Sequence, residues 1–178
     1  IIGADEFIKS KIRYCLWLVN CPPNILSQMP LVLDRVKKCK EMREKSTFEG
    51  TRKLALTPTV FRETYNPASY IVVPSVSSER RKYVPIGFLD GNTIATNLVL
   101  IIPDASLYDF GIITSTMHME WMRYVCGRLK SDYRYSKDIV YNNFPWPDPT
   151  ERQKKSVEAA AQSILSVRNK FPEASMAD

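Results

Sequence analysis

The sequence predicts an α+β fold, in which a small, mostly antiparallel sheet has flanking helices and is followed by a C-terminal helix. Three observations predict it. Apolar residues recur at helical spacing on both sides of residues 58–103, short β-favouring runs fill that middle region, and a helix-start signal precedes the last apolar stripe. With 178 residues, 44% of them hydrophobic and 25% charged, the chain is long enough to bury a core.

The N-terminal part predicts one strand and one helix. Residues 13–19 (RYCLWLV) are rich in aromatic and β-favouring side chains, which is typical of a strand. Pro30 suits the first turn of a helix, and Val32, Val36 and Cys39 follow at helical spacing. The same helix is crowded with Lys and Arg. A charge run of this kind most often marks a solvated helix face, and we expect one here.

Three β-favouring runs predict the sheet. They are residues 70–74, 83–88 and 98–103, separated by polar or turn-forming pieces such as DGN at 90–92. Pro74 and Pro85 cannot donate to a strand ladder, so we expect the strands that hold them to be edge-like or irregular.

Helical spacing returns over residues 105–127, with Gly127 placed to end the helix. We expect the apolar stripe of this helix to pack in the core rather than to bind a ligand. The stripe consists of Leu107, Phe110, Thr114, Met117, Trp121 and Tyr124. A connector rich in Arg, Lys, Tyr and Asn follows over residues 128–149.

The last helix has a full set of start signals. Asp148 can cap it, Pro149 suits its first position, and Glu151 stands three residues after the cap, as in a capping box. Its predicted apolar stripe, ended by Pro172, consists of Val157, Ala161, Ile164, Val167 and Phe171. We therefore expect two parts, residues 1–147 and a C-terminal helix and tail over residues 148–178.

The charge balance favours an anionic partner. The formal net charge is +6, which fits nucleic acid but is weak evidence alone. The four cysteines lack the paired spacing of a zinc site, and we expect reduced thiols. No apolar run is long enough to span a membrane and no signal-peptide pattern is present, so we expect a cytoplasmic protein. Because the sequence begins with Ile1, we expect a piece of a longer polypeptide.

The motifs of several enzyme classes are missing. There is no glycine-rich phosphate loop and no G-x-G-x-x-G, and the acidic residues do not show the spacing with a lysine that a metal-dependent nuclease needs. The sequence NPAS at 66–69 lacks the second proline and the aromatic residue of an amino-methyltransferase loop. His118, the single histidine, stands without a nearby acid or nucleophile, and we give it no catalytic role.

Four stretches carry a resemblance to a known family. They are RYCLWL at 13–18, TRKLALTPTVF at 51–61, YIVVPSVSSERRKYVPIGFL at 70–89 and LYDFGIITSTMHMEWMRYVCGRLKSDYRYSKDIVYNNFPWP at 107–147. Together they resemble the C-terminal third of MmeI-like (type IIL) bacterial restriction–modification enzymes. The layout of the last stretch is also similar to recognition domains of type I specificity subunits.

The resemblance implies a role. MmeI-like enzymes combine a nuclease, an adenine-N6 DNA methyltransferase and a target-recognition domain in one chain, and residues 1–147 correspond to the target-recognition domain. The resemblance implies double-stranded DNA and the methyltransferase domain of the same polypeptide as partners, and no membrane. We expect no cofactor and no metal here, since S-adenosylmethionine and a divalent metal serve the other domains. We therefore expect a non-catalytic fragment of an enzyme.

The segment VPSVSSERRKYVPIGF at 73–88 is the main candidate for DNA contact. If residues 77–83 are extended, alternate side chains point to opposite faces. We expect one face to contact base edges, because Arg suits guanine and Glu suits the cytosine amino group. That face holds Ser77, Glu79, Arg81 and Tyr83. A solvated turn with a surface Arg–Glu pair is the alternative.

We expect a second set of residues, all of them basic except Ser78, to contact the DNA backbone. They are Ser78, Arg80 and Lys82 in the same segment, Arg52 and Lys53, and Arg128, Lys130, Arg134 and Lys137 in the connector. If the segment does not set the target, discrimination moves to other polar residues, namely Ser46, Thr47, Arg62, Glu63 and Asn92. Two other functions stay open: an assembly domain that docks on the methyltransferase domain without reading bases, and an independent enzyme with a noncontiguous site.

Overall fold

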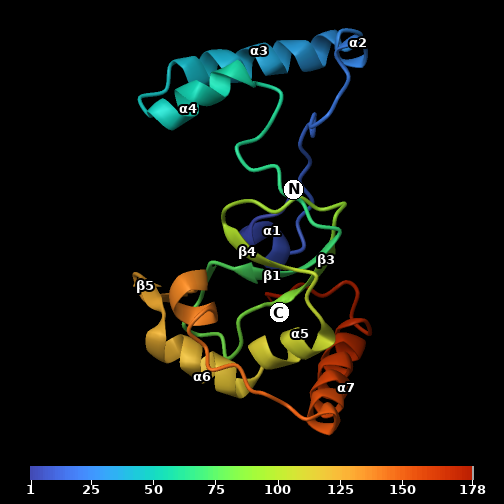
Figure 1. Cartoon of the computed structure of the whole chain (residues 1–178), viewed down its shortest axis with the longest axis vertical. Helices are drawn as coiled ribbons and strands as arrows, with labels where there is room; N and C mark the ends of the chain where they lie inside the picture. The colour runs from blue at the N-terminus through green and yellow to red at the C-terminus, as the bar shows by residue number, and fades with distance from the viewer. Residues whose placement is uncertain (178) are drawn as a thin grey trace. The chain divides into compact units, whose positions relative to one another are not determined.

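The computed structural model describes residues 1–177 and divides into two compact units. Unit 2 is residues 14–65, and unit 1 is residues 1–13 together with the chain from residue 66 onward (Figure 1). The elements of unit 2 are α2 (Pro23–Leu26), α3 (Pro30–Glu44), α4 (Glu49–Lys53) and the 3-10 turn η1 (Leu54–Leu56). The elements of unit 1 are α1 (Ala4–Ile8), β1 (Ser69–Pro74), β2 (Val76–Ser77), β3 (Gly87–Asp90), β4 (Val99–Pro103), α5 (Leu107–Ile113), α6 (Thr116–Val125), β5 (Gly127–Leu129), β6 (Asp132–Arg134), the π-helical turn η2 (Lys137–Tyr141) and α7 (Glu151–Arg168).

The main sheet of unit 1 has the order β3-β1-β4, and both pairings are antiparallel. Val72 in the central strand pairs with Gly87 on one side and Ile101 on the other. The predicted runs 70–74 and 98–103 match β1 and β4 closely. The predicted strand at 83–88 begins only at Gly87, because Pro85 has no N–H to donate to a ladder. The predicted α+β class is confirmed.

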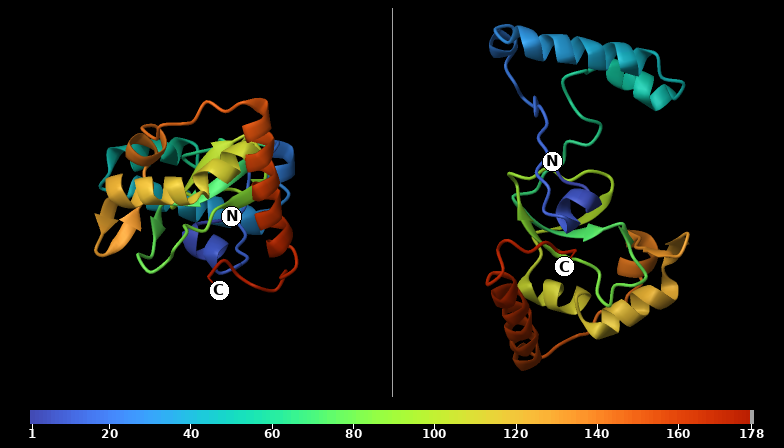
Figure 2. Two further views of the ribbon diagram at one scale, coloured as in Figure 1. Left: turned by 90° about the horizontal axis from the view of Figure 1, so that it is seen from below. Right: turned by 180° about the vertical axis from the view of Figure 1, so that it is seen from behind.

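The two faces of β1 build two cores. Ile71 and Val73 point into the larger core, which α5, α6 and α7 cover, while Tyr70 and Val72 point to the opposite side, where Phe7 of α1 packs. Figures 1 and 2 show α1 on one side of the sheet and these three helices on the other. The alternation of side chains along an extended strand produces this division. The main sheet of unit 1 is therefore covered by apolar side chains on both faces.

The predicted helix over residues 105–127 is wrong in one respect, because it is two helices. α5 ends at Ile113, and α6 starts afresh after Ser115, whose hydroxyl accepts a hydrogen bond from the backbone N–H of His118. The restart changes which residues face inward, so Met117 and Tyr124 of the predicted stripe are exposed. The buried residues of α6 are His118, Met119 and Met122. A serine cap accounts for the break, since it favours starting a helix over continuing one.

The cap of the last helix differs from the prediction. Thr150, not Asp148, caps α7, and Gln153 completes the capping box. Ala161 is the buried residue of α7, and it packs where Gly111 lets α5 approach closely. Ile164, Val167 and Phe171 of the predicted stripe are 38%, 54% and 62% exposed. The predicted boundary at residue 147 remains a prediction, and within unit 1 α7 packs on α5.

Unit 2 is a helical arm with few buried side chains. α3 begins at Pro30, as predicted. Arg43 holds the arm together, because its guanidinium donates to the carbonyl oxygens of Leu54, Thr57 and Val60 at 2.9–3.0 Å. The predicted strand at residues 13–19 is wrong. Its β-favouring side chains find no partner strand in the described chain, and Trp17 stacks on Phe61 instead, with ring centroids 5.6 Å apart.

Candidate nucleic-acid interface

A second, smaller sheet of unit 1 carries the candidate site. Its strand order is β2-β6-β5, all antiparallel, and β5 and β6 form a hairpin with Lys130 and Ser131 at its tip. Lys130 has a positive φ of 56°, which the tight turn requires. The predicted connector at 128–149 therefore begins with a hairpin. A short exposed hairpin suits insertion into a groove, because the major groove of DNA admits a two-stranded ribbon.

The small sheet has an inner and an outer face. Tyr133 pairs with Ser77 and Arg128 and packs against the larger core. Arg134 pairs with Val76 and Gly127, and Asp132 pairs with Leu129, so these residues form the outer face. Gly127 has no side chain beside Arg134, and a Cβ there would lie 3.9 Å from Cβ of Arg134. The outer face therefore presents one acid and one base from a single strand.

The segment Ser78–Lys82, here called the basic turn, follows β2 directly. It is not extended as predicted, because the backbone N–H of Arg81 donates to the carbonyl of Ser78 at 3.1 Å and closes a turn. The backbone N–H of Glu79 donates to the carboxylate of Asp132 at 3.4 Å. Glu79, Arg80 and Lys82 are exposed and Arg81 is half-buried. The turn thus brings the Glu79–Lys82 charges beside the hairpin.

One of the predicted base-contacting residues, Ser77, lies differently from the prediction. Ser77 is buried at 4% exposure, and its hydroxyl finds no hydrogen-bond partner among the described residues. The Ser77 side chain therefore faces the core and not a DNA groove. Val76 is the residue of β2 on the outer face of the small sheet. Tyr83 is 42% exposed, and its hydroxyl lies 3.1 Å from the Thr116 hydroxyl.

Several predicted backbone contacts already have partners within the chain. Arg52 donates to the carbonyls of Ser46 and Thr47 at 2.8–2.9 Å, and Lys53 pairs with Glu49 at 2.8 Å. Arg128 lies 4.1 Å from the Tyr133 ring centroid and donates to the Ser131 carbonyl. Across residues 1–177, other predicted contacts have no acidic side chain within 4 Å. They are Arg80, Arg81, Lys82, Lys130, Arg134 and Lys137.

The residues predicted as the alternative set for target discrimination each contact a residue that is close to them in the sequence. Ser46 and Thr47 offer their carbonyls to Arg52. Arg62 and Glu63 pair with each other at 3.8 Å on an exposed stretch of unit 2. Asn92 donates to the carboxylate of Asp90 in the turn after β3. None of these pairs combines acid and base on a sheet face as Asp132 and Arg134 do.

Asp132 is the residue that sequence reasoning missed. Its carboxylate bonds to the basic turn across a sequence separation of 53 residues, which no local pattern could reveal. A weaker signal was present in SDYR at 131–134, where an acid and a base stand on either side of a tyrosine directly after a turn. Such spacing places both charged side chains on one face of a strand.

A buried pair fixes the base of the hairpin. The Nε2 atom of His118 lies 2.8 Å from the hydroxyl of Tyr135, the residue directly after β6. Burial lowers the pKa of His118 to about 4, so the imidazole is neutral near pH 7. Burial also raises the pKa of Tyr135. The pair therefore anchors β6 to α6 without a charge.

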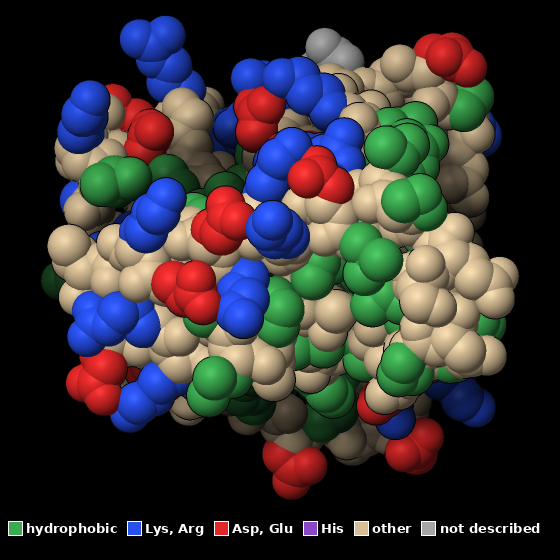
Figure 3. Space-filling model, turned by 90° about the horizontal axis from the view of Figure 1, so that it is seen from above, with side chains coloured by type: hydrophobic (Ala, Val, Ile, Leu, Met, Phe, Trp, Pro, Cys, Tyr) green, Lys and Arg blue, Asp and Glu red, His purple; other side chains and the backbone are tan. Residues whose placement is uncertain are grey.

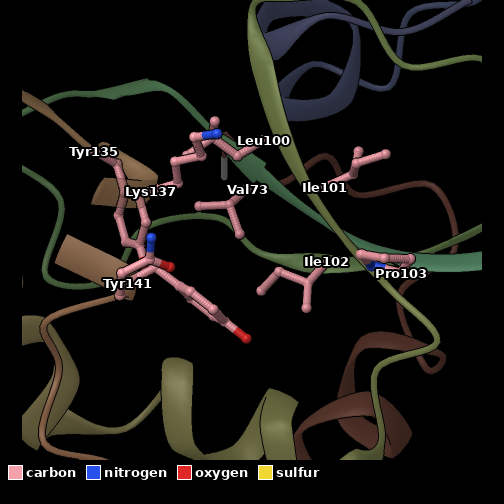
Figure 4. A pocket seen from close by; sticks show the side chains of 9 residues that line it. Val73, Leu100, Ile101, Ile102, Pro103, Tyr135, Lys137 and Tyr141 are labelled. Atoms are coloured by element: carbon pink, nitrogen blue, oxygen red, sulfur yellow. The ribbon is translucent and has the colours of Figure 1, made fainter. Parts of the chain in front are cut away.

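A cavity of about 250 Å³ lies between the main sheet and η2 (Figure 4). Val73, Leu100 and Ile102 come from the sheet, and Tyr135, Lys137 and Tyr141 come from the opposite side. The wall is apolar apart from the ends of Lys137, Tyr141 and Asn142. Such a cavity does not suit a phosphate or a base edge, both of which need several polar partners. The small sheet and the basic turn are the better candidates.

The described part of the chain contains no group of three or more His, Cys, Asp or Glu residues arranged to hold a metal. No helix within residues 1–177 has both the length and the apolar content to cross a bilayer. At the small sheet, guanidinium and ammonium groups can donate hydrogen bonds, and two carboxylates can accept them. Guanine O6 and N7 accept from Arg, and the cytosine amino group donates to Asp or Glu.

Comparisons with known proteins identify the family of this chain. The family model described as MmeI, target recognition domain, matches residues 1–148. DNA methyltransferase A of Bacillus subtilis (strain 168) is 49% identical over 168 residues, which is 94% of this chain and 19% of that protein. A solved structure of the Type IIL restriction-modification enzyme MmeI in complex with DNA matches 99% of this chain and 24% of that chain, with 47% identity and a TM-score of 0.96. The chain thus spans about a quarter or less of either relative, and it belongs to the MmeI target recognition domain family.

Proposed function

We propose that this chain reads the sequence of double-stranded DNA for a restriction–modification enzyme. One contact carries the proposal: the backbone N–H of Glu79 donates to the carboxylate of Asp132 at 3.4 Å. The two acidic residues therefore lie close together, among basic residues that have no acidic partner. A purely phosphate-binding surface has no use for two carboxylates. A surface that reads base edges does, because cytosine and adenine present amino donors in the major groove.

The roles of the residues follow from their chemistry. Arg81 and Arg134 can donate in pairs to guanine, and Glu79 and Asp132 can accept from an exposed amino group. Ser77 is left out, since its side chain is buried. Tyr83 remains a candidate for contact at the margin, with its ring next to the ammonium of Lys82.

Other cations suit the DNA backbone. Arg80 and Lys82 flank the half-buried Arg81, and Lys130 projects from the tip of the hairpin. Exposed cations without an acidic partner are available to phosphates, and they contribute affinity without sequence preference. Arg128 is held by Tyr133 and Ser131, and we assign it to support of the hairpin.

The catalytic steps are proposed to lie in other domains of the same polypeptide. These would be an adenine-N6 methyltransferase domain, which uses S-adenosylmethionine, and an endonuclease domain, which uses a divalent metal. This chain would bind neither S-adenosylmethionine nor the divalent metal. It would hold the duplex against the methyltransferase domain. The MmeI structure in complex with DNA and the similarity to a DNA methyltransferase support this arrangement.

A binding selection tests the proposal. The chain is titrated with a randomised pool of short duplexes at about 50 mM and about 200 mM salt, and the bound sequences are read out. We expect one short site to be enriched, and we expect Asp132→Asn and Glu79→Gln to change its sequence. The matched control is Glu158→Gln, which removes a carboxylate from the surface of α7, and it should leave the site unchanged.

Three outcomes distinguish the alternatives. An enriched site that both carboxylate variants leave untouched would move base reading away from the small sheet. Salt-dependent binding without enrichment would mean that this chain supplies only backbone contacts. No binding at either salt concentration would favour the assembly function, in which the basic surface meets another protein domain.

A further inference from the structure

The helical arm, unit 2, holds most of the chain's excess positive charge. Residues 14–65 contain nine Lys and Arg and five Asp and Glu, a net +4 of the total +6. The candidate interface described above lies entirely in unit 1. The arm therefore carries a charge excess for which base reading by the small sheet does not account.

The contacts within the arm determine which side of α3 faces outward. Val32, Val36, Cys39 and Arg43 recur at helical spacing, and each is partly buried. Arg43 donates to three carbonyls from the segment that packs against α3. This line of residues is the inner side of the helix, and residues that lie a quarter turn to a half turn away from it face outward.

A line of five residues runs along the outward side and is here called the outer stripe. Its members follow at steps of three and four: Leu31, Arg35, Lys38, Met42 and Lys45. All five are exposed. At 1.5 Å per residue the stripe is about 21 Å long, which is enough to follow several phosphates of a duplex.

The cations of the outer stripe are available to a ligand. Arg35 and Lys45 have no acidic side chain within 4 Å among residues 1–177. Lys38 contacts Asp34 at 2.6 Å, and this pair lowers the pKa of Asp34, but both side chains are more than half exposed. Exposed pairs of this kind are weak because water and salt screen them, so a phosphate can replace the carboxylate.

The surface chemistry favours a polyanion over an apolar partner. On the face that Figure 3 shows, Lys and Arg side chains spread over one part, mixed with Asp and Glu, and hydrophobic side chains gather over another. Within the stripe, Leu31 and Met42 are eleven positions apart and form no continuous apolar patch. Flexible cations are thus the main feature that the stripe offers.

We propose that the outer stripe of α3 is a second, sequence-independent contact with the sugar–phosphate backbone of duplex DNA. The proposal rests on the proposed function, because it takes the same duplex as its ligand. Arg35, Lys38 and Lys45 bind phosphates and release their counterions, while Leu31 and Met42 lie against sugar carbons. This contact adds affinity and lengthens the footprint, and it leaves base preference to the small sheet.

A triple variant tests the proposal in the full chain. Arg35→Gln, Lys38→Gln and Lys45→Gln remove three charges and keep a residue that favours helix. The matched control, Arg152→Gln, Lys154→Gln and Lys155→Gln, removes three charges from α7 in unit 1. The logarithm of the binding constant is measured against the logarithm of salt concentration, on a duplex with the enriched site and on one without it. Circular dichroism checks that helix content is kept.

We expect the α3 variant to reduce the salt slope by about two to three units and the α7 control by less than about one, since each phosphate contact contributes about 0.9. Both duplexes should lose affinity by the same factor, so the specificity ratio stays unchanged. In a hydroxyl-radical footprint, protection beyond the enriched site should vanish in the α3 variant and persist in Asp132→Asn.

Other outcomes separate the two proposals. If the unaltered chain enriches a site and the α3 variant keeps its slope and footprint, the arm is not a DNA contact and the proposed function stands. If the specificity ratio collapses in the α3 variant, the stripe reads bases and is not a backbone contact. If the unaltered chain binds no duplex at about 50 mM salt, both proposals are wrong. That result would favour an acidic protein surface as the partner of the outer stripe.

Discussion

The Nε2 atom of His118 lies 2.8 Å from the hydroxyl oxygen of Tyr135, and both side chains are buried. Phe144 closes over the imidazole, with ring centroids 4.5 Å apart and nearly perpendicular planes. Because Tyr135 directly follows β6, this one hydrogen bond ties the strand that carries Asp132 and Arg134 to the core of unit 1. The base contacts proposed for Asp132 and Arg134 depend on such rigid support.

Replacing Tyr135 with Phe should destabilise unit 1. The hydroxyl is lost while His118 stays buried, so a polar nitrogen is left without its partner, at a cost of about 1–3 kcal/mol. The free energy of unfolding is measured by chemical denaturation. Tyr124→Phe is the matched control, because Tyr124 is 93% exposed, and it should change stability by less than about 0.5 kcal/mol. Equal effects of the two variants would contradict a role for the buried bond.

Stability should depend on pH through His118, the single histidine of the chain. Burial lowers the pKa of His118 to about 4 in the folded state, below its ordinary value of 6.5. Between these values the unfolded chain binds the proton and the folded chain does not, so stability falls as pH decreases from about 6.5 to about 4. The slope from this group is at most about 1.4 kcal/mol per pH unit, and above about pH 7 it contributes none.

The measurement for this pH dependence is a set of denaturation curves between pH 4 and pH 8 for the unaltered chain and for His118→Gln. Carboxylates titrate in both proteins, so the difference between the two curves isolates the histidine. We expect that difference to change steadily below about pH 6.5 and to be constant above pH 7. A constant difference across the whole range would show that His118 titrates normally in the folded chain.

Gly111→Ala should destabilise the packing of α5 on α7. A Cβ at this position would lie 2.6 Å from Cγ1 of Val157 and 3.3 Å from Cβ of Ala161. The clash should outweigh the better helix propensity of alanine, for a net loss of about 1–3 kcal/mol. Denaturation of the double variant with Val157→Ala is the check. It should lose less stability than the sum of the single variants, but the Val157 carbonyl at 3.2 Å limits the rescue.

Arg43→Lys should loosen the helical arm although the charge is kept. The fork of the guanidinium reaches three carbonyls, and a single ammonium cannot satisfy all of them. We expect faster cleavage within residues 14–65 under limited proteolysis, consistent with a loss of about 1–3 kcal/mol. Arg35→Lys on the same helix is the control and should be cleaved at the unaltered rate. Indistinguishable rates would mean that the three hydrogen bonds do not limit the opening of the arm.

Local sequence signals predicted much of the fold. Pro30 starts α3, and the runs at 70–74 and 98–103 form β1 and β4, because proline geometry and β-favouring runs act within a few residues. The split between α5 and α6 was missed, since the Ser115 cap competes with a helical pattern that continues through it. The strand predicted at 13–19 failed for a different reason: a strand needs a partner, and composition does not supply one.

The candidate site, like the fold, was predicted only where its features are local in the sequence. The charges of Glu79–Lys82 were visible in the sequence as an anomaly between two apolar runs. Their neighbour Asp132 was not, because the contact joins residues that are distant in the chain. The assignment of Ser77 to the reading face assumed an extended segment, and the turn at Arg81 together with the burial of Ser77 rules that out.

The sequence by itself determined the α+β class, the basic character, the position of the charged segment and the resemblance to MmeI-like enzymes, because these depend on composition, local spacing and shared motifs. Only the tertiary structure decided which cations are free and which are held, since Arg43 and Arg52 are bound by carbonyls that no pattern marks as their partners. It also decided that Asp132, rather than Ser77, stands beside Glu79. The physical reason is that pairing across strands and capture by distant backbone groups are set by how the chain packs, and this is fixed only once the whole core has formed.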